Sequence, residues 1–296
     1  TKKRKTTTTV KRSVASRGAV ASPALRAAGA ATTAANPAPT TTTAPTTPTT
    51  TVPTTMVTPQ GTNWTLTWSD EFTNGLNPAW NVITTGGGVF DDVFGDECYQ
   101  AGQVTVTDGA LNLTAAARPT ACRGATKPYV SGLVTTRNKF SQLYGRFEAR
   151  LRMPVVRGTW PAWWLMPSKP VYGEWPGSGE IDVMEFVADW PDVVYQTVHW
   201  AENGTHLQDA SAWHVSESAA AWHTYALEWE RGELRWYVDD ALVKTYRPPT
   251  GGPPFDQPFY LILNQAVGGN WAGAPNVAEL PSTVSVDWVR VYQRTA

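Results

Sequence analysis

Residues 223–246, "HTYALEWERGELRWYVDDALVKTY", give the clearest indication of the fold class. Apolar and polar residues alternate along this stretch with a period of two, the pattern of a β-strand with one buried face. The alternation is interrupted at Arg231-Gly232 and at Asp239-Asp240, and Gly and Asp are common in tight turns. The stretch therefore predicts three consecutive antiparallel strands.

The same alternation recurs along the rest of residues 61–296. The segment "QVTVTDGALNLTA" (103–115) predicts two strands joined by a tight Asp-Gly turn, and "FYLILNQAV" (259–267) and "VSVDWVRVYQ" (284–293) predict further strands. Helical periodicity is hard to find, so we expect helix only as short turns. Many antiparallel strands over about 235 residues indicate an all-β domain, either a β-sandwich or a closed barrel.

The composition changes sharply near residue 60. Residues 1–60 contain 19 Thr, 7 Pro and 8 of the 24 Lys and Arg residues, but no Asp, Glu or Trp. Residues 61–296 therefore carry 16 basic and 25 acidic side chains, a net charge of −9, together with all 15 Trp. The first segment has too few large apolar residues to offset the entropy of ordering. We expect a disordered, basic then Thr/Pro-rich tail at 1–60 and one folded domain at 61–296.

The basic cluster "TKKRKTTTTVKRS" (1–13) has two interpretations. It matches the basic region of an export signal, although Arg17 and Arg26 interrupt what should be the apolar core, so we interpret it as a degenerate signal and expect a secreted protein. The alternative is a nucleic-acid-binding arm. The acidic domain would repel phosphates, so we expect no nucleic-acid partner. No stretch approaches ~18 consecutive apolar residues, so we expect no membrane association, and we expect a monomer.

The two cysteines, Cys98 and Cys122, have two possible states. In an exported protein they would form a disulfide that closes a surface loop. The alternative is two free buried thiols, and the neighbouring Thr/Pro linker favours the disulfide. The 4 His residues show no metal-ligand spacing.

The segment "SGEIDVMEFV" (178–187) places three carboxylates inside an apolar run typical of a buried strand. On a regular strand Glu180 and Asp182 point to one face, whereas Glu185 points to the other. One β-bulge at 183–184 would bring Glu185 back to the face of the first two, and bulges are common beside active sites. We therefore predict a bulged strand with all three acids on one concave face.

Three carboxylates this close repel one another, so at least one must hold a proton at neutral pH. One ionised carboxylate and one carboxylic acid, ~5–5.5 Å apart, are what a retaining glycosidase uses as nucleophile and general acid/base. The alternative is an ion-paired patch on a solvated edge strand. The apolar residues between the acids argue against it, because they pack one face of the strand.

Four Trp residues lie close to the acids in the sequence: Trp160, Trp163, Trp164 and Trp175. Flat aromatic faces stack on sugar rings, so a glycan cleft is one explanation, and a Trp-rich core is the other. Strand alternation sends Trp163 to the face opposite Trp160 and Trp164, so we expect two or three of the four in the cleft. His199 follows on the next expected strand, either as a hydrogen-bond donor to sugar or carboxylate or as a structural histidine.

Seven segments in order carry a resemblance: "WSDEF" (68–72), "YGRFEARLRMP" (144–154), "WPAWWLMP" (160–167), "GEIDVME" (179–185), "YQTVHW" (195–200), "LNQAVGGNW" (263–271) and "VDWVRVY" (286–292). They are similar to glycoside hydrolase family 16, particularly its laminarinase-like endo-β-1,3-glucanases. The resemblance implies a jelly-roll β-sandwich of two antiparallel sheets with an open concave substrate cleft. It also implies the site residues: Glu180 as nucleophile, Asp182 as its assisting acid, Glu185 as acid/base, and Trp160, Trp164, Trp175 and His199 as substrate-binding residues.

The function implied by the resemblance is retaining endo-hydrolysis of β-1,3-glucosidic bonds in laminarin-type β-glucans by double displacement, with no cofactor for catalysis. One alternative is a hydrolase or transglycosylase acting on mixed-linkage β-glucan or red-algal galactan. A second is a non-catalytic glycan-binding domain, although such relatives lose one or more of the three acids.

The sequence departs from the family pattern at two positions. Asp96 stands where the family often has an amide that contacts sugar, and Gln265 stands where relatives often have an aliphatic residue. Gln265 is therefore either a new sugar contact or a buried amide that needs partners. The family also commonly holds a structural calcium ion, and Glu71, Gly109 and Asp287 are the matching positions. By this resemblance Glu71 and Gly109 would supply backbone carbonyl groups, and Asp287 would supply the one carboxylate. A single carboxylate makes such a site weak.

Overall fold

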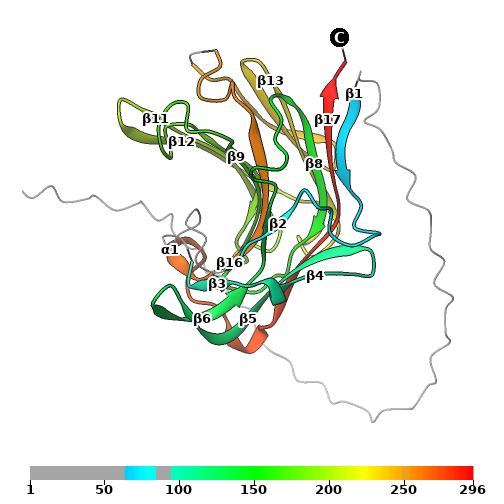
Figure 1. The fold of residues 1–296 in the computed structure, drawn as a ribbon, viewed down its shortest axis with the longest axis vertical. Helices are drawn as coiled ribbons and strands as arrows, with labels where there is room; N and C mark the ends of the chain where they lie inside the picture. Colours follow the sequence, from blue (N-terminus) through cyan, green and yellow to red (C-terminus); the bar gives the residue numbers. More distant parts are fainter. Residues whose placement is uncertain (1–63, 85–94, 250, 296) are drawn as a thin grey trace, which may run out of the picture. The chain divides into compact units, whose positions relative to one another are not determined.

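The computed structural model describes residues 64–84, 95–249 and 251–295, and these form two β-sheets packed face to face (Figure 1). The expected tail at 1–60 lies outside the described residues, so the division at residue 60 stays a prediction. No helix in the described ranges is long and apolar enough to cross a membrane.

The strands in chain order are β1 (Trp64–Asp70), β2 (Asn81–Val82), β3 (Glu97–Tyr99), β4 (Val104–Thr107), β5 (Ala110–Cys122), β6 (Ala125–Ser131), β7 (Leu133–Thr135), β8 (Gly145–Arg152), β9 (Thr159–Pro167), β10 (Glu180–Phe186), β11 (Val193–Glu202), β12 (Thr205–His214), β13 (His223–Glu230), β14 (Glu233–Val238), β15 (Ala241–Tyr246), β16 (Phe259–Val267) and β17 (Ser282–Arg294). Helical residues in the described part form only short turns, at α1 (Gly269–Ala272) and in two 3₁₀ turns.

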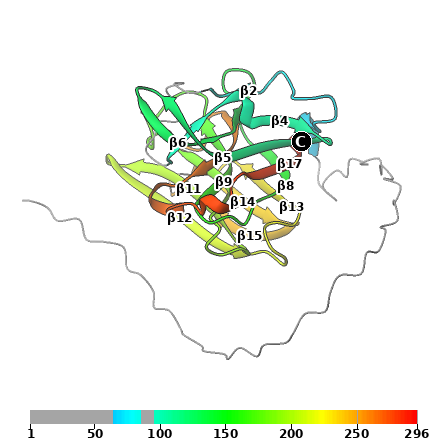
Figure 2. The same ribbon diagram turned by 90° about the horizontal axis from the view of Figure 1, so that it is seen from below.

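One sheet has ten strands, with the order β15-β14-β13-β8-β17-β5-β6-β3, β1 beside β17 and β4 beside β5. The other has seven, in the order β12-β11-β10-β9-β16-β7-β2. Figure 1 shows β8 and β17 in one layer and β9, β16 and β11 in the other, and Figure 2 shows β17 beside β5 in the ten-stranded sheet. The sheets do not close on each other, so the predicted jelly-roll sandwich is confirmed and the closed barrel is wrong. One pair departs from the antiparallel expectation, because β3 and β6 run parallel.

The three strands expected at 223–246 are confirmed as β13, β14 and β15. Asp239 and Asp240 form the second turn with φ angles of 47° and 64°. Two residues in the left-handed region give a two-residue hairpin the twist of its flanking strands, and Asp tolerates this conformation well. The hairpin expected at 103–115 is likewise formed by β4 and β5.

The hydrophobic core lies between the two sheets, because each strand directs alternate residues inward. Its largest fully buried side chains include Trp163 on β9, Trp229 on β13 and Trp236 on β14. The core side of Trp163 confirms the predicted alternation among the clustered tryptophans. Both sheets therefore contribute buried Trp side chains to the core between them.

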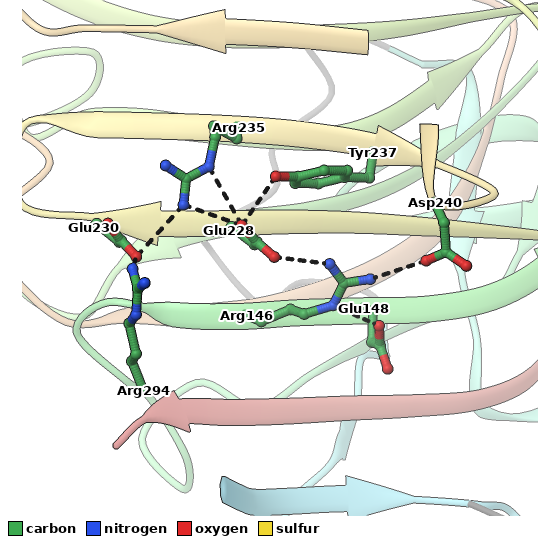
Figure 3. Close-up of polar contacts among 8 residues, drawn as sticks. All are labelled: Arg146, Glu148, Glu228, Glu230, Arg235, Tyr237, Asp240 and Arg294. Atoms are coloured by element: carbon green, nitrogen blue, oxygen red, sulfur yellow. Dashed lines mark hydrogen bonds and ion pairs between the residues drawn. The ribbon is translucent and has the colours of Figure 1, made fainter. Parts of the chain in front are cut away.

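The face of the ten-stranded sheet turned away from the core carries a charged network centred on Arg146 (Figure 3). The Arg146 guanidinium lies between the carboxylates of Glu148 (2.8 Å) and Glu228 (3.1 Å). The second oxygen of Glu228 accepts hydrogen bonds from Arg235 (3.1 Å) and the Tyr237 hydroxyl (3.0 Å). Arg146 and both of its glutamates are buried, so each charge depends on its partners.

The predicted disulfide between Cys98 and Cys122 is present, with the two Cα atoms 6.1 Å apart. Cys98 lies on β3 and Cys122 ends β5, and both sulfur-bearing side chains pack on Val130 of β6 in a small cluster beside the main core. The bond thus joins strands of one sheet within a buried cluster.

Candidate active site

The three carboxylates lie on β10, whose ladder contains one extra residue at the predicted place. On the β9 side Asp182 pairs with Trp164, but Met184 pairs with Trp163, so one residue is skipped. The β11 side shows the same irregularity between Asp182 and Glu185. Ile181, Val183, Met184 and Phe186 all enter the core. The predicted bulge at 183–184 is confirmed, and it leaves Glu180, Asp182 and Glu185, hereafter the acid cluster, on the other face of the strand.

Two side chains of the ten-stranded sheet hold the backbone around the bulge from across the core. The Trp236 indole N–H donates to the carbonyl oxygen of Asp182 at 2.9 Å. The Lys244 ammonium donates to the carbonyl oxygen of Gln196, the β11 residue opposite the bulge, at 3.0 Å. Lys244 is also paired with Asp209 (2.8 Å), which compensates its burial. The sequence pattern gave no sign of these contacts.

Asp182 and Glu185 are buried and Glu180 is partly buried, and the negative charges of the cluster act on one another. Burial, reinforced by the charge of Asp182, raises the pKa of Glu180 to about 8. Burial, reinforced by the charge of Glu180, raises the pKa of Glu185 to about 7. Burial and the charge of Glu185 also raise the pKa of Asp182. The cluster therefore holds protons at neutral pH, as the spacing predicted.

His199 lies beside the acid cluster on β11 and is the direct ladder partner of Glu180. Its Nε2 is 3.3 Å from Asp182 Oδ2, an ion-pair distance when the imidazole is protonated. A positive charge on His199 lowers the pKa of both Glu180 and Glu185. Of the two roles expected for His199, the structure supports contact with a carboxylate.

Two tryptophans donate indole N–H groups to the two outer members of the acid cluster. Trp160 Nε1 donates to Glu185 Oε1 at 3.0 Å, and Trp175 Nε1 donates to Glu180 Oε2. The Trp175 side chain is 43% exposed, so one ring face is accessible beside the carboxyl group. Both tryptophans thus lie in the site, as expected, and each fixes one carboxylate.

Trp164 occupies the same face but is tied to a neighbouring strand. Its indole N–H donates to Asn264 Oδ1 on β16 at 2.8 Å, and Asn264 Nδ2 donates to the Tyr99 hydroxyl at 3.1 Å. The ring packs in a small apolar cluster with Tyr260 and Ile262. Trp164 therefore borders the site on the β16 side.

The structure brings further residues to the site that the sequence analysis did not select. The Trp271 ring, on α1, makes edge contacts with Trp160 and with Tyr195 at centroid distances of 5.0 and 5.1 Å. The Thr197 hydroxyl donates to Glu185 Oε2 at 3.3 Å. His206 on β12 contacts His199. Trp271, Tyr195 and Thr197 lie within segments that carry the family resemblance, which was the available signal. His206 lies outside those segments, and only the pairing between β11 and β12 brings it to the site.

Of the two departures from the family pattern, the structure decides the role of Gln265. Gln265 is fully buried, and its amide lies 2.9 Å from the Ser282 hydroxyl, with the Leu113 carbonyl as a second partner. It is thus the buried amide of the two alternatives. The Asp96 carboxylate accepts the Gly269 backbone N–H at 3.4 Å, at the start of α1.

The expected calcium positions meet around β17. Asp70 pairs with Val289 and Leu111 with Val286, so Glu71 and Gly109 each lie close to Asp287 in the ladder. However, Asp287 is paired with Arg150 at 2.5 Å, and the Glu71 carboxylate binds Arg290. A calcium ion would need to displace the Arg150 guanidinium from the one carboxylate ligand. This donor set fits calcium poorly, and calcium binding stays a prediction.

The chain is similar to known proteins over most of its length. The family "Glycosyl hydrolases family 16" matches residues 95–290. A β-glucanase from Rhodothermus marinus is 40% identical over 254 residues, which cover 78% of this chain and 86% of that protein. The solved laminarinase from Rhodothermus marinus superposes with a TM-score of 0.70 at 39% identity, covering 80% of this chain and all of the other. The laminarinase catalytic domain from Thermotoga maritima MSB8 gives a TM-score of 0.72 at 32% identity, covering 79% and 100%. This chain belongs to glycoside hydrolase family 16.

Proposed function

We propose that this chain is an endo-acting hydrolase that cleaves β-1,3-glucosidic bonds within laminarin-type β-glucans and retains the anomeric configuration. The observation that carries the proposal is the bulge in β10, because it brings Glu180 and Glu185 to one face with a tryptophan N–H on each. The similarity to laminarinases and a β-glucanase supports the substrate class.

The chemistry needs only the acid cluster and water. Glu185 donates its proton to the glycosidic oxygen as Glu180 attacks the anomeric carbon, so the glycosidic bond breaks and a covalent glycosyl-enzyme ester forms. Glu185, now a carboxylate, then takes a proton from water, and the resulting hydroxide displaces Glu180 from the sugar. Two inversions at one carbon give overall retention.

The proton distribution must be adjusted before the first step. Glu180 must be ionised and Glu185 protonated, whereas the pKa of Glu180, about 8, is the higher of the two. The corresponding free energy is small, on the order of 1 kcal/mol, which a single substrate hydrogen bond can offset. The glycosidic oxygen favours a proton on Glu185, and positive charge developing at the anomeric carbon favours a carboxylate at Glu180. Substrate binding thus selects the productive state.

The aromatic side chains around the cluster suit a sugar chain. Trp160, Trp175 and Trp271 surround the two reacting carboxyl groups, and Trp175 and Trp271 are 43% and 41% exposed. Aromatic faces bind the apolar faces of glucosyl rings. We further propose that the enzyme acts outside the cell as a monomer; the Thr/Pro-rich tail and the disulfide support export.

Product analysis on laminarin, mixed-linkage β-glucan and agarose tests the proposal. We expect oligosaccharides of several lengths from laminarin, with the β-anomer formed first in proton NMR. Glu180→Gln and Glu185→Gln should each lose at least about 1,000-fold in kcat, and Glu217→Gln, an exposed acid, should match the parent. Faster release from agarose or mixed-linkage glucan would reassign the substrate. Binding without any product would instead indicate a glycan-binding domain.

A further inference from the structure

His206, the second histidine of the site, makes a hydrogen bond with His199 that the proposed reaction itself does not require. His206 Nε2 lies 2.9 Å from His199 Nδ1, and the two ring centroids are 5.1 Å apart. The contact follows from the strand register: Ala201 pairs with His206, and His199 pairs with Gln208, so the two histidines are diagonal neighbours on one face. We propose that His206 is a positioning residue that fixes the tautomer of His199.

The proton positions follow from the two contacts of His199. Its Nε2 faces Asp182 at 3.3 Å, and its Nδ1 faces His206. In the neutral pair we assign His206 Nε2–H as the donor to Nδ1, because the reverse direction would turn the Nε2 lone pair of His199 towards Asp182; the one proton of His199 then sits on Nε2. When the pair holds one extra proton, His199 Nδ1–H donates to a neutral His206, and Nε2 again carries a proton. In both states an N–H faces Asp182.

Without His206, neutral His199 could hold its proton on Nδ1. The Nε2 lone pair would then face the Asp182 carboxylate, and the two would repel unless Asp182 took a proton. Asp182 and Glu180 share a hydrogen bond, so a proton on Asp182 would alter the charge of the proposed nucleophile. The inference concerns the reaction proposed above and rests on it.

The surroundings favour a fixed, neutral His206. Its ring packs against Trp175 at a centroid distance of 4.9 Å, and Trp175 is itself hydrogen-bonded to Glu180. Partial burial and the neighbouring His199 both lower the pKa of His206, which favours a neutral ring there.

Charged groups also lie near the pair. The acid cluster on β10 faces His199 and favours positive charge on the pair. Two further acids, Glu174 and Glu202, line a neighbouring pocket that Trp175 also lines. His206 places that charge on the ring nearest Asp182.

The test compares His206→Ala with His206→Gln, whose side-chain amide can replace the imidazole Nε2 with Nε2 as a donor or Oε1 as an acceptor. His206→Ala should lower kcat about tenfold, the value of one hydrogen bond of about 1.4 kcal/mol, with KM changed less than about twofold. The acidic limb of its pH profile should move to higher pH, since the positive charge on His199, which lowers the pKa of Glu180, loses its hydrogen-bond partner. His206→Gln should restore both. His214→Ala is the matched control, because His214 lies on the same strand and pairs with Asp192 on the exposed surface.

The tautomer itself is measured by ¹⁵N NMR of the His199 ring, which needs no turnover. The neutral parent should show a proton on Nε2, and His206→Ala should show an Nδ1–H fraction. If the Ala variant keeps the parent tautomer and profile, or if Gln behaves like Ala, the inference is wrong. A rise in KM alone would also overturn it, since that result indicates direct substrate contact. An inactive parent with the expected NMR response would refute the proposed function and leave the role of His206 intact.

Discussion

Trp236, on the ten-stranded sheet, donates its indole N–H across the core to the backbone carbonyl of Asp182, on the opposite sheet, at 2.9 Å. The bulge at 183–184 interrupts the hydrogen-bond ladder beside this carbonyl. The indole N–H from the facing sheet supplies the hydrogen bond that a neighbouring strand would otherwise make. The conformation that aligns the acid cluster thus depends on both sheets.

Trp236→Phe should therefore lower activity as well as stability. The variant leaves a buried carbonyl without its donor, at about 1–3 kcal/mol, and loosens the bulge, so kcat should fall at least about tenfold. Trp229→Phe is the control, because Trp229 donates in the same way to the Phe255 carbonyl, away from the bulge. Urea unfolding should show similar losses for both variants. Equal kcat values for both would contradict the role given to Trp236.

Arg146→Met should destabilise the domain without changing the chemistry. It leaves the buried carboxylates of Glu148 and Glu228 without their shared guanidinium (Figure 3), and breaking a buried pair costs about 3–5 kcal/mol. Arg247→Met removes an exposed partner of Glu233 and should cost about 0–1 kcal/mol. Denaturant midpoints measure both. Equal losses of stability in the two variants would show that the buried network around Arg146 stabilises the domain no more than an exposed ion pair does.

Glu180→Gln should stabilise the protein increasingly as pH rises. The folded-state pKa of Glu180 is raised from 4.5 to about 8, so between these values the folded protein retains a proton that the unfolded chain releases. Stability of the parent therefore falls as pH increases through this window. The variant lacks this loss, and its advantage should reach the order of 4 kcal/mol at pH 8. Melting temperatures at pH 4.5, 6 and 8 measure it, with Glu217→Gln as the control; a constant difference across pH would contradict the raised pKa.

Calcium should stabilise the parent only weakly, because Arg150 already neutralises Asp287. Arg150→Gln frees that carboxylate. It should therefore increase the rise in melting temperature between a sample in EDTA and a sample in about 5 mM calcium. Asp287→Asn should abolish any rise. A large calcium effect on the parent, equal to that of Arg150→Gln, would show that the ion displaces the guanidinium.

Much of this arrangement could be predicted from local patterns. Period-two alternation identified the strands at 223–246, and the spacing of the acids required the bulge before Glu185, since both depend on residues adjacent in sequence. The core position of Trp163 followed from the same alternation.

The rest depends on contacts between distant strands. His206 reaches His199 only because the β11–β12 register places them diagonally, and Trp236 reaches Asp182 only because two sheets stack. The engagement of Asp287 by Arg150 likewise depends on β8 lying beside β17. A pattern of residue types does not specify such registers, so the reacting groups could be predicted but the groups that position them could not.

The covalent step is the central claim, and trapping the intermediate tests it most directly. An activated 2-deoxy-2-fluoro β-glucoside, or its β-1,3-linked disaccharide, slows release of the sugar from the nucleophile. Peptide mass spectrometry of the inactivated enzyme should find one fluoroglycosyl group, on Glu180. A label on Glu185 or Asp182, or release of the α-anomer from the β-linked substrate, would contradict the account.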